Sequence, residues 1–375
     1  MISIPSNITA LTPYKPGQTP EETARLYGIS DVVKLASNEN PLGASPLALQ
    51  AVNSLSGSAY SLYPDGGLAL RESLAEQFGT NVENVICHSG SDALIHLAHR
   101  TFVTPSDTLV SARGTFIGFQ VAASLSGAEI IYTSLTGDYR FDAEALVNAV
   151  TPKTKVLYIA NINNPTGTYL TADELTYILD RTPETTLVIL DEAYFEYSLY
   201  IADDYPDGMA LRRPNTLILR TFSKCYGLAG LRVGYGIGDS GVIAAMLKAK
   251  LPFEPNTAGQ AAAKAALRDK EFLQKTVELN ARGLKLFRRT IEEANLYAPV
   301  SAGNFVMLDC GNSETAERVF HSLLRKGFIT RPLAGGFALP NCIRVNTGTD
   351  EQNERFCSAL RETAAEIPEL ARVRQ

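Results

Sequence analysis

The chain has 375 residues, of which 45% are hydrophobic and 20% charged, and its formal net charge is −6 with both signs mixed along the sequence. This is the composition of a globular protein with two domains, or with one large domain and an appendage. It argues against a nucleic-acid binder, which usually carries a basic stripe. It also argues against a membrane protein, because no apolar run is long enough to cross a bilayer.

The first residues and the cysteines predict a cytoplasmic location. Residues 1–17 are too polar and too rich in proline for a signal peptide. The five cysteines are scattered along the chain and include no C-x-x-C pair. We therefore expect them to be small core residues in a reducing compartment, and to form neither disulfides nor a zinc site.

Short apolar runs alternate with helical patterns from about residue 66 to 250. Helical patterns occupy residues 67–79, 91–103 and 171–182. Several of these runs are apolar at both the odd and the even positions, as in strands that are covered on both faces of a sheet. The seven predicted strands span residues 84–89, 108–112, 129–133, 155–161, 186–191, 215–220 and 231–237. The alternation predicts an α/β fold with a mostly parallel, seven-stranded sheet.

The pattern changes after residue 250. The segment "LPFEPNT" contains two prolines, and a long helical stretch follows it over residues 258–295. Shorter strands and helices come next and predict a smaller α/β domain. We expect an N-terminal arm at residues 1–36, a large domain at 37–257, and a small C-terminal domain at 258–375 that includes the long linking helix.

Polar side chains stand at the ends of three predicted strands. The segments "NINNPTG", "DEAYFEY" and "TFSKCYG" supply Asn164, Asp191, Tyr194 and Lys224 there. Ligands of parallel sheets bind beyond the carboxyl ends of the strands, so these side chains are expected to converge. The set suits pyridoxal phosphate. The amine can form a Schiff base with the aldehyde, the carboxylate can pair with the ring nitrogen, and the phenol and amide can donate to the ring oxygen.

The phosphate of this cofactor needs an anion site. Ser91 and Asp92 follow a predicted strand and open a helix, whose exposed N–H groups can bind phosphate. Ser223 and Arg232 can add a hydroxyl and a planar charged fork. Taken singly, each residue has an ordinary alternative as a helix cap or a turn. Their joint occurrence, each after a strand, favours the cofactor site.

The same segments resemble a known family. "NNPTG", "DEAYFEY" and "TFSKCYGLAGLRVGY" are similar to blocks of the class-II pyridoxal-phosphate aminotransferases of fold type I. "KLASNENPLGASP", "YPDGGLALRESLA", "SGSDALI", "NFVML" and "IRVNTGT" narrow the resemblance to the histidinol-phosphate aminotransferase family. The resemblance covers nearly the whole chain.

The resemblance implies a role for each cofactor-binding position. Lys224 would hold the cofactor covalently and then move the proton in transamination, Asp191 would pair with the ring nitrogen, and Phe116 would stack on the ring. Tyr194 and Asn164 would contact the ring hydroxyl. The implied cofactor contacts are Ser91, Asp92, Phe116, Asn164, Asp191, Tyr194, Ser223, Lys224 and Arg232.

Other implied contacts lie farther from the cofactor ring. Tyr63 would reach the phosphate from a partner subunit, so the resemblance implies a homodimer, in which the arm lies on the small domain or on the partner. Arg344 would clamp the substrate carboxylate. Asn38 would bind substrate, and Tyr14 and Arg331 would lie near its distal end.

The implied activity is transamination between histidinol phosphate and 2-oxoglutarate in histidine biosynthesis. The alternatives are an aromatic amino acid aminotransferase, a threonine-phosphate decarboxylase and a regulator that keeps this fold as a sensor.

"GIGDSG" at residues 236–241 matches a dinucleotide-binding fingerprint, but no second strand ending in an acid follows it. His96 and His99 have no carboxylate or cysteine beside them, so we expect no metal site.

Overall fold

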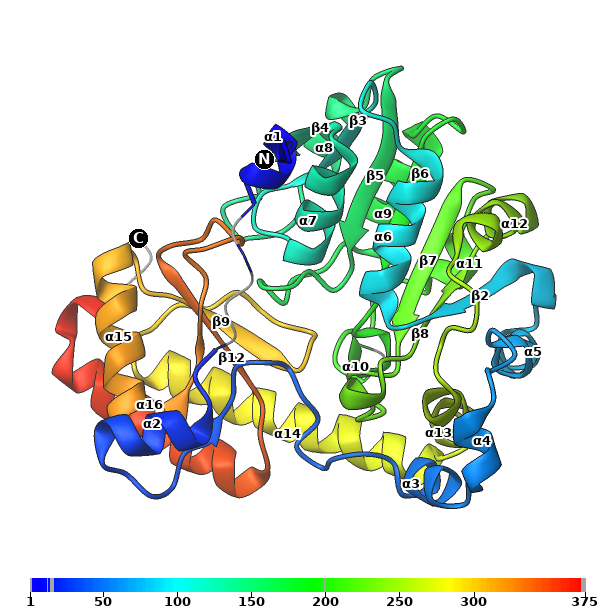
Figure 1. Ribbon diagram of the computed structural model, residues 1–375. Coiled ribbons are helices and arrows are strands. Elements are labelled where there is room, and N and C mark those ends of the chain that lie inside the picture. Colours follow the sequence, from blue (N-terminus) through cyan, green and yellow to red (C-terminus); the bar gives the residue numbers. More distant parts are fainter. Residues whose placement is uncertain (1, 12, 14–16, 199, 372–375) are drawn as a thin grey trace.

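The larger of two lobes is built on a seven-stranded sheet (Figure 1). The computed structural model describes all residues except 1, 12, 14–16, 199 and 372–375. All strands of the sheet run in one direction except β8, which is antiparallel to both of its neighbours. The fold is therefore α/β and mostly parallel, as predicted. Across the sheet the strands are β2 (Val85–His88), β8 (Gly234–Ile237), β7 (Thr216–Thr221), β6 (Leu187–Asp191), β5 (Thr154–Ala160), β3 (Thr108–Ala112) and β4 (Glu129–Thr133).

Helices cover both faces of this sheet. Along β5, Tyr158 and Ala160 belong to one hydrophobic cluster and Leu157 and Ile159 to another, so this strand is buried on both sides. This is why its sequence is apolar at successive positions. The first cluster involves α6 (Ser91–Phe102), α7 (Ile117–Ser126) and α12 (Ser240–Ala249), and the second α8 (Ala143–Ala149) and α9 (Ala172–Arg181).

A third cluster covers the edge of the sheet formed by β2 and β8. It contains Leu70, Leu74, Val85, Tyr235 and Ile237. Its helices come from distant parts of the chain: α13 (Thr257–Ala266) packs on both α3 (Pro46–Asn53) and α5 (Leu68–Phe78). Helix α3, which precedes the first strand of this sheet in the sequence, thus packs on α13, which follows the last strand.

The smaller lobe has its own core, which includes Phe287, Val319, Phe356 and Leu360. Its antiparallel sheet has the order β11-β12-β9, and β1 and β10 form a separate parallel pair. The strands are β9 (Phe305–Asp309), β11 (Arg331–Pro332), β12 (Cys342–Asn346), β1 (Val33–Lys34) and β10 (Phe328–Ile329). The main helices are α14 (Lys270–Glu293), α15 (Ser313–Arg325) and α16 (Asp350–Glu366).

The predicted helix over residues 258–295 is two helices, α13 and α14. The chain breaks between them at Asp269, whose carboxylate caps α14 by accepting from the Phe272 backbone N–H at 3.2 Å. The same carboxylate accepts from the Ser45 hydroxyl at 2.6 Å. Because α13 packs on α3, this part of the predicted linking helix lies against the larger lobe.

The described part of residues 1–36 contacts both lobes. In α1 (Ser6–Thr9), the Asn7 side chain donates to the Ser124 carbonyl of α7 at 3.0 Å. By contrast, α2 (Pro20–Tyr27) packs on α15, and β1 pairs with β10. The division at residues 36/37 and 257/258 stays a prediction. The remaining short helices are α4 (Gly57–Ser61), α10 (Phe195–Ser198) and α11 (Gly208–Leu211).

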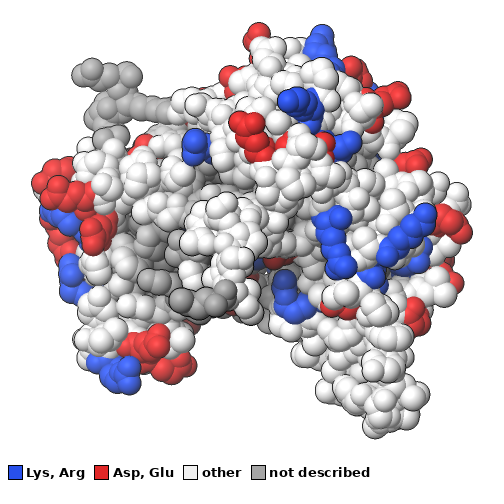
Figure 2. Space-filling model, turned by 45° about the horizontal axis from the view of Figure 1, so that its top comes forward, with Lys and Arg blue, Asp and Glu red and all other residues white. Residues whose placement is uncertain are grey.

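Charged side chains of both signs are scattered over the face shown in Figure 2. Among the described residues, no helix is both long and apolar enough to cross a membrane.

Candidate active site

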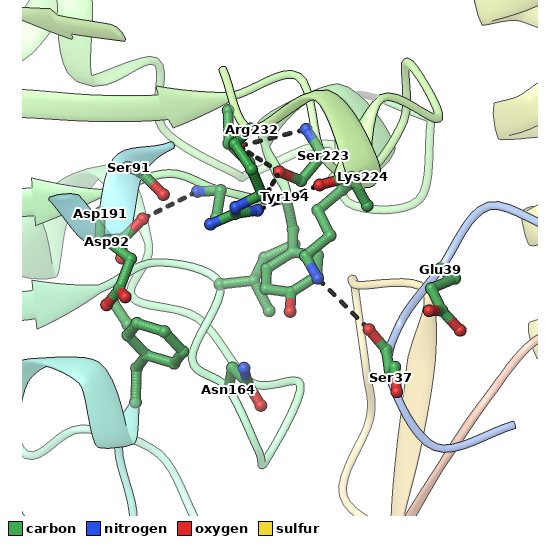
Figure 3. A pocket seen from close by; sticks show the side chains of 16 residues that line it. Ser37, Glu39, Ser91, Asp92, Asn164, Asp191, Tyr194, Ser223, Lys224 and Arg232 are labelled. Carbon is green, nitrogen blue, oxygen red and sulfur yellow. Dashed lines mark hydrogen bonds between the residues drawn. The ribbon is translucent and has the colours of Figure 1, made fainter. Parts of the chain in front are cut away.

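A cavity of about 270 Å³ lies beyond the carboxyl ends of the sheet strands (Figure 3). Strand β6 ends at its wall with Asp191, and Thr221, Ser223 and Lys224 come at the end of β7 and just after it. Nine residues that the sequence predicts as cofactor contacts line this one cavity: Ser91, Asp92, Phe116, Asn164, Asp191, Tyr194, Ser223, Lys224 and Arg232.

Lys224 is the amine of the cavity. Its Nζ donates to the backbone carbonyl of Ser37 at 3.4 Å and lies 5.8 Å from the centroid of the Tyr194 ring. Burial lowers the pKa of Lys224 to about 8, with the nearby Arg344 as the next cause. A minor fraction of this amine is therefore neutral near physiological pH, and the neutral form is the one that can act as a nucleophile or a base.

Asp191 faces Lys224 across the cavity (Figure 3). Its two carboxylate oxygens accept from fixed donors, the Tyr158 hydroxyl at 2.9 Å and the Ala193 backbone N–H at 3.2 Å. Burial raises the pKa of Asp191 to about 6, against the effect of these two hydrogen bonds. A cationic partner in the cavity would favour the ionised form further.

Arg232 and the start of α6 form an anion site at one end of the cavity. The Arg232 Nη1 donates to the Ser223 hydroxyl at 3.4 Å. A Cβ added to Gly90 would lie 2.8 Å from Arg232 Nη2, so the guanidinium sits directly on the turn before α6. A Cβ on Gly234 would lie 2.3 Å from the Ser91 backbone nitrogen, so only glycine lets β8 pass this close to the helix start. A guanidinium, a hydroxyl and helix N–H groups together suit a phosphate.

A hydrogen-bonded chain of residues joins the cavity to the smaller lobe. The Asn38 Nδ2 donates to the Tyr194 hydroxyl at 2.8 Å, which leaves the tyrosine proton to donate elsewhere. Arg344 is buried and donates to the Asn164 side-chain oxygen, and it also donates to the Ala36 carbonyl at 2.8 Å. Asn38 and Arg344 are thus in contact with lining residues but do not line the cavity themselves.

Besides Asn38 and Arg344, two other predicted site residues that the structure describes, Tyr63 and Arg331, do not line this cavity. Tyr63 is 80% exposed, and its ring stacks on Phe253 with centroids 4.2 Å apart. Arg331 lies opposite Arg344 in the pairing of β11 with β12, in the smaller lobe. Tyr14 lies outside the described residues. The roles of all three stay predictions.

Ser37, Glu39 and Thr221 line the cavity although they were not among the predicted site residues. Thr221 carried a signal, because it is the last residue of β7. Ser37 contacts Lys224 through its backbone carbonyl, a contact that no side-chain pattern reveals. Glu39 lies in the loop after β1, where the neighbouring Asn38 contacts Asn346 of the smaller lobe and Tyr194 of the larger one. The position of Glu39 at the cavity therefore depends on tertiary contacts.

The sequence matches known aminotransferases over almost its full length. Residues 30–360 match the family described as aminotransferase class I and II. The chain is 42% identical over 362 residues to the histidinol-phosphate aminotransferase of Geobacillus sp. (strain WCH70), which covers 96% of this chain and 97% of that protein. It is 40% identical over 360 residues to the histidinol-phosphate aminotransferase of Anaeromyxobacter sp. (strain Fw109-5), and the match covers 95% of this chain and 98% of that protein.

Solved structures agree with this assignment. The histidinol-phosphate aminotransferase from Sinorhizobium meliloti, in complex with pyridoxal-5'-phosphate, has a TM-score of 0.86 at 30% identity and covers 97% of this chain and 98% of that chain. An aspartate aminotransferase from Thermus thermophilus shares the fold, with a TM-score of 0.82 at 22% identity and coverage of 96% and 100%. The chain therefore belongs to the class I and II aminotransferases and, within them, to the histidinol-phosphate aminotransferase family.

Proposed function

We propose that this chain is a pyridoxal-phosphate-dependent aminotransferase that exchanges an amino group between histidinol phosphate and 2-oxoglutarate. The observation that carries the proposal is the cavity itself, which brings Lys224 together with an anion site and with Asp191. The substrate comes from the relatives, which carry the name histidinol-phosphate aminotransferase at about 40% identity over nearly the whole chain.

The residues of the cavity fit pyridoxal phosphate. Arg232, Ser223 and the start of α6 would hold its phosphate, and Asp191 would meet its ring nitrogen. In addition, Asp92 lines the cavity, and its buried Oδ1 accepts no hydrogen bond within the described part of the chain. When bound, the cofactor supplies an aldehyde that amines can attack and a ring that takes up electrons.

The protein residues then bind, orient and move protons. At pH 7 about a tenth of a lysine with a pKa near 8 is neutral, so the Lys224 Nζ can act as nucleophile and can take a proton from the substrate carbon that bears the amino group. The Tyr194 hydroxyl and the Asn164 amide would orient the cofactor ring. Arg344, held by Asn164 and Ala36, would bind the carboxylate of the glutamate produced from 2-oxoglutarate.

A panel of amino donors tests the substrate. The purified protein is loaded with pyridoxal phosphate and assayed with 2-oxoglutarate and either histidinol phosphate, phenylalanine or tyrosine. We expect kcat/KM to be highest for histidinol phosphate. A preference for phenylalanine or tyrosine would identify an aromatic aminotransferase. Release of carbon dioxide from threonine phosphate without any oxo acid would identify a decarboxylase.

We also propose that the chain acts as a homodimer. Leu62, Tyr63, Leu251 and Phe253 are exposed, and an apolar patch of this kind is typical of a protein–protein interface. Tyr63 and Phe253 stack on one another within this patch, which supports a rigid contact surface. Sedimentation equilibrium at micromolar concentration is expected to give the dimer mass, and a monomer mass would contradict the proposal.

We further propose that the enzyme is located in the cytoplasm. All five cysteines are buried and form no disulfide in the described part of the chain, as in proteins of a reducing compartment. Recovery of the native chain from a secreted or membrane fraction would contradict this location.

A further inference from the structure

Tyr158 lies behind the cavity, in the middle of β5, and has no part in the mechanism described above. Its side chain is fully buried, and its hydroxyl donates to Asp191 Oδ2 at 2.9 Å. In the pairing of β5 with β6, Tyr158 lies opposite Ile189, two residues before Asp191. The contact is thus a diagonal one between neighbouring strands, and long aromatic side chains reach such neighbours.

The Tyr158 hydroxyl is a fixed donor. Its ring stacks on Phe119 with centroids 4.5 Å apart and an interplanar angle of 7°. Its backbone carbonyl accepts from the Ser111 hydroxyl at 2.9 Å. Burial and the neighbouring Asp191 carboxylate raise the pKa of Tyr158 well above its ordinary value, so the phenol keeps its proton.

Asp191 needs such a donor because most of its surroundings favour the neutral acid. Burial raises the pKa of Asp191, and the carboxylates of Asp92 and Glu192 raise it further. The Tyr158 hydroxyl and the Ala193 N–H are the groups that stabilise the ionised form. Only the hydroxyl can be removed by substitution without altering the backbone.

We propose that Tyr158 is a positioning residue, whose hydroxyl keeps the Asp191 carboxylate ionised and directed toward the ring nitrogen of the cofactor. The inference rests on the proposed function, because it concerns the group that pyridoxal phosphate places in the cavity. Tyr158 does not line the cavity, so it would act through Asp191.

The test compares Tyr158→Phe with a matched control, Ser111→Ala. Both remove one buried hydroxyl from the same layer, but only the first removes a partner of Asp191. We expect Tyr158→Phe to weaken the Kd of pyridoxal phosphate for the cofactor-free protein about 10- to 100-fold, as for loss of a hydrogen bond to a charged group. We expect kcat to fall by a similar factor, with the KM for histidinol phosphate unchanged. Ser111→Ala should leave Kd and kcat within about twofold of the wild type.

A double-mutant cycle separates positioning from general damage to the fold. In an Asp191→Ala background, Tyr158→Phe should change the Kd of pyridoxal phosphate by less than about twofold, because its partner is already absent. An unchanged Kd in the single variant would overturn the inference. So would an equal loss in Ser111→Ala, or the same loss in both backgrounds. Failure of the wild type to bind pyridoxal phosphate or to transaminate would instead overturn the proposed function.

Discussion

Replacing Lys224 by alanine is expected to abolish transamination while leaving the fold intact. Lys224 is the lysine that lines the cavity, and its Nζ lies within reach of both the Ser37 carbonyl and the Tyr194 ring. Its loss removes both the nucleophile and the proton carrier, so kcat should fall by about 10⁴-fold or more. The measurement is glutamate formation from 2-oxoglutarate and histidinol phosphate, with circular dichroism to confirm folding.

The cofactor should still bind to this variant without a covalent bond. Arg232 and Ser223 remain at the anion site, so equilibrium dialysis is expected to recover pyridoxal phosphate at near one per chain at saturating concentration. Lys248→Ala is the matched control, because Lys248 is an exposed lysine at the end of α12 and should retain full activity. Wild-type activity in Lys224→Ala would contradict the assignment of this lysine.

Replacing Arg220 by alanine is expected to lower the free energy of unfolding more than replacing an arginine in an exposed ion pair. Arg220 is buried in β7, and its guanidinium donates from Nε to Glu192 at 2.9 Å and from Nη2 to Asp207 at 2.9 Å. The same group lies 3.3 Å from the centroid of the Phe195 ring. Without it, the fully buried Glu192 carboxylate is left without its cation, so the free energy of unfolding should fall by about 3–5 kcal/mol.

Urea unfolding at fixed protein concentration measures this loss. Arg213→Ala is the control, because Arg213 forms its ion pair with Asp180 at the surface, where both side chains are partly exposed. Exposed pairs contribute about 1 kcal/mol or less, so this variant should unfold close to the wild type. Equal losses in the two variants would show that burial of the Arg220 pair does not determine its contribution.

The sheet and most of the cavity were predictable because both depend on local sequence. A parallel strand buried on both faces is apolar at successive positions, and residues at its carboxyl end point toward the ligand site. This is why Asp191 and Lys224 were recognisable from their place after β6 and β7. The break at Asp269 was not, because its carboxylate is fixed by Ser45, which is distant in sequence. No glycine or proline marks that position.

The other differences have the same physical origin. Tyr158 reads as one more apolar residue of a buried strand, and only the pairing of β5 with β6 brings its hydroxyl to Asp191. Ser37 acts through its backbone, which sequence patterns do not describe. Tyr63 is exposed and does not line the cavity of its own chain, so its predicted contact would come from a second subunit.

The most direct test of the central claim is reduction of the cofactor-loaded wild-type protein with borohydride, followed by peptide mapping by mass spectrometry. Reduction fixes a bond between a lysine amine and the aldehyde of pyridoxal phosphate. The structure predicts one phosphopyridoxyl group per chain, carried by the peptide that contains Lys224. An unmodified Lys224 peptide, or a label on another lysine, would contradict the account.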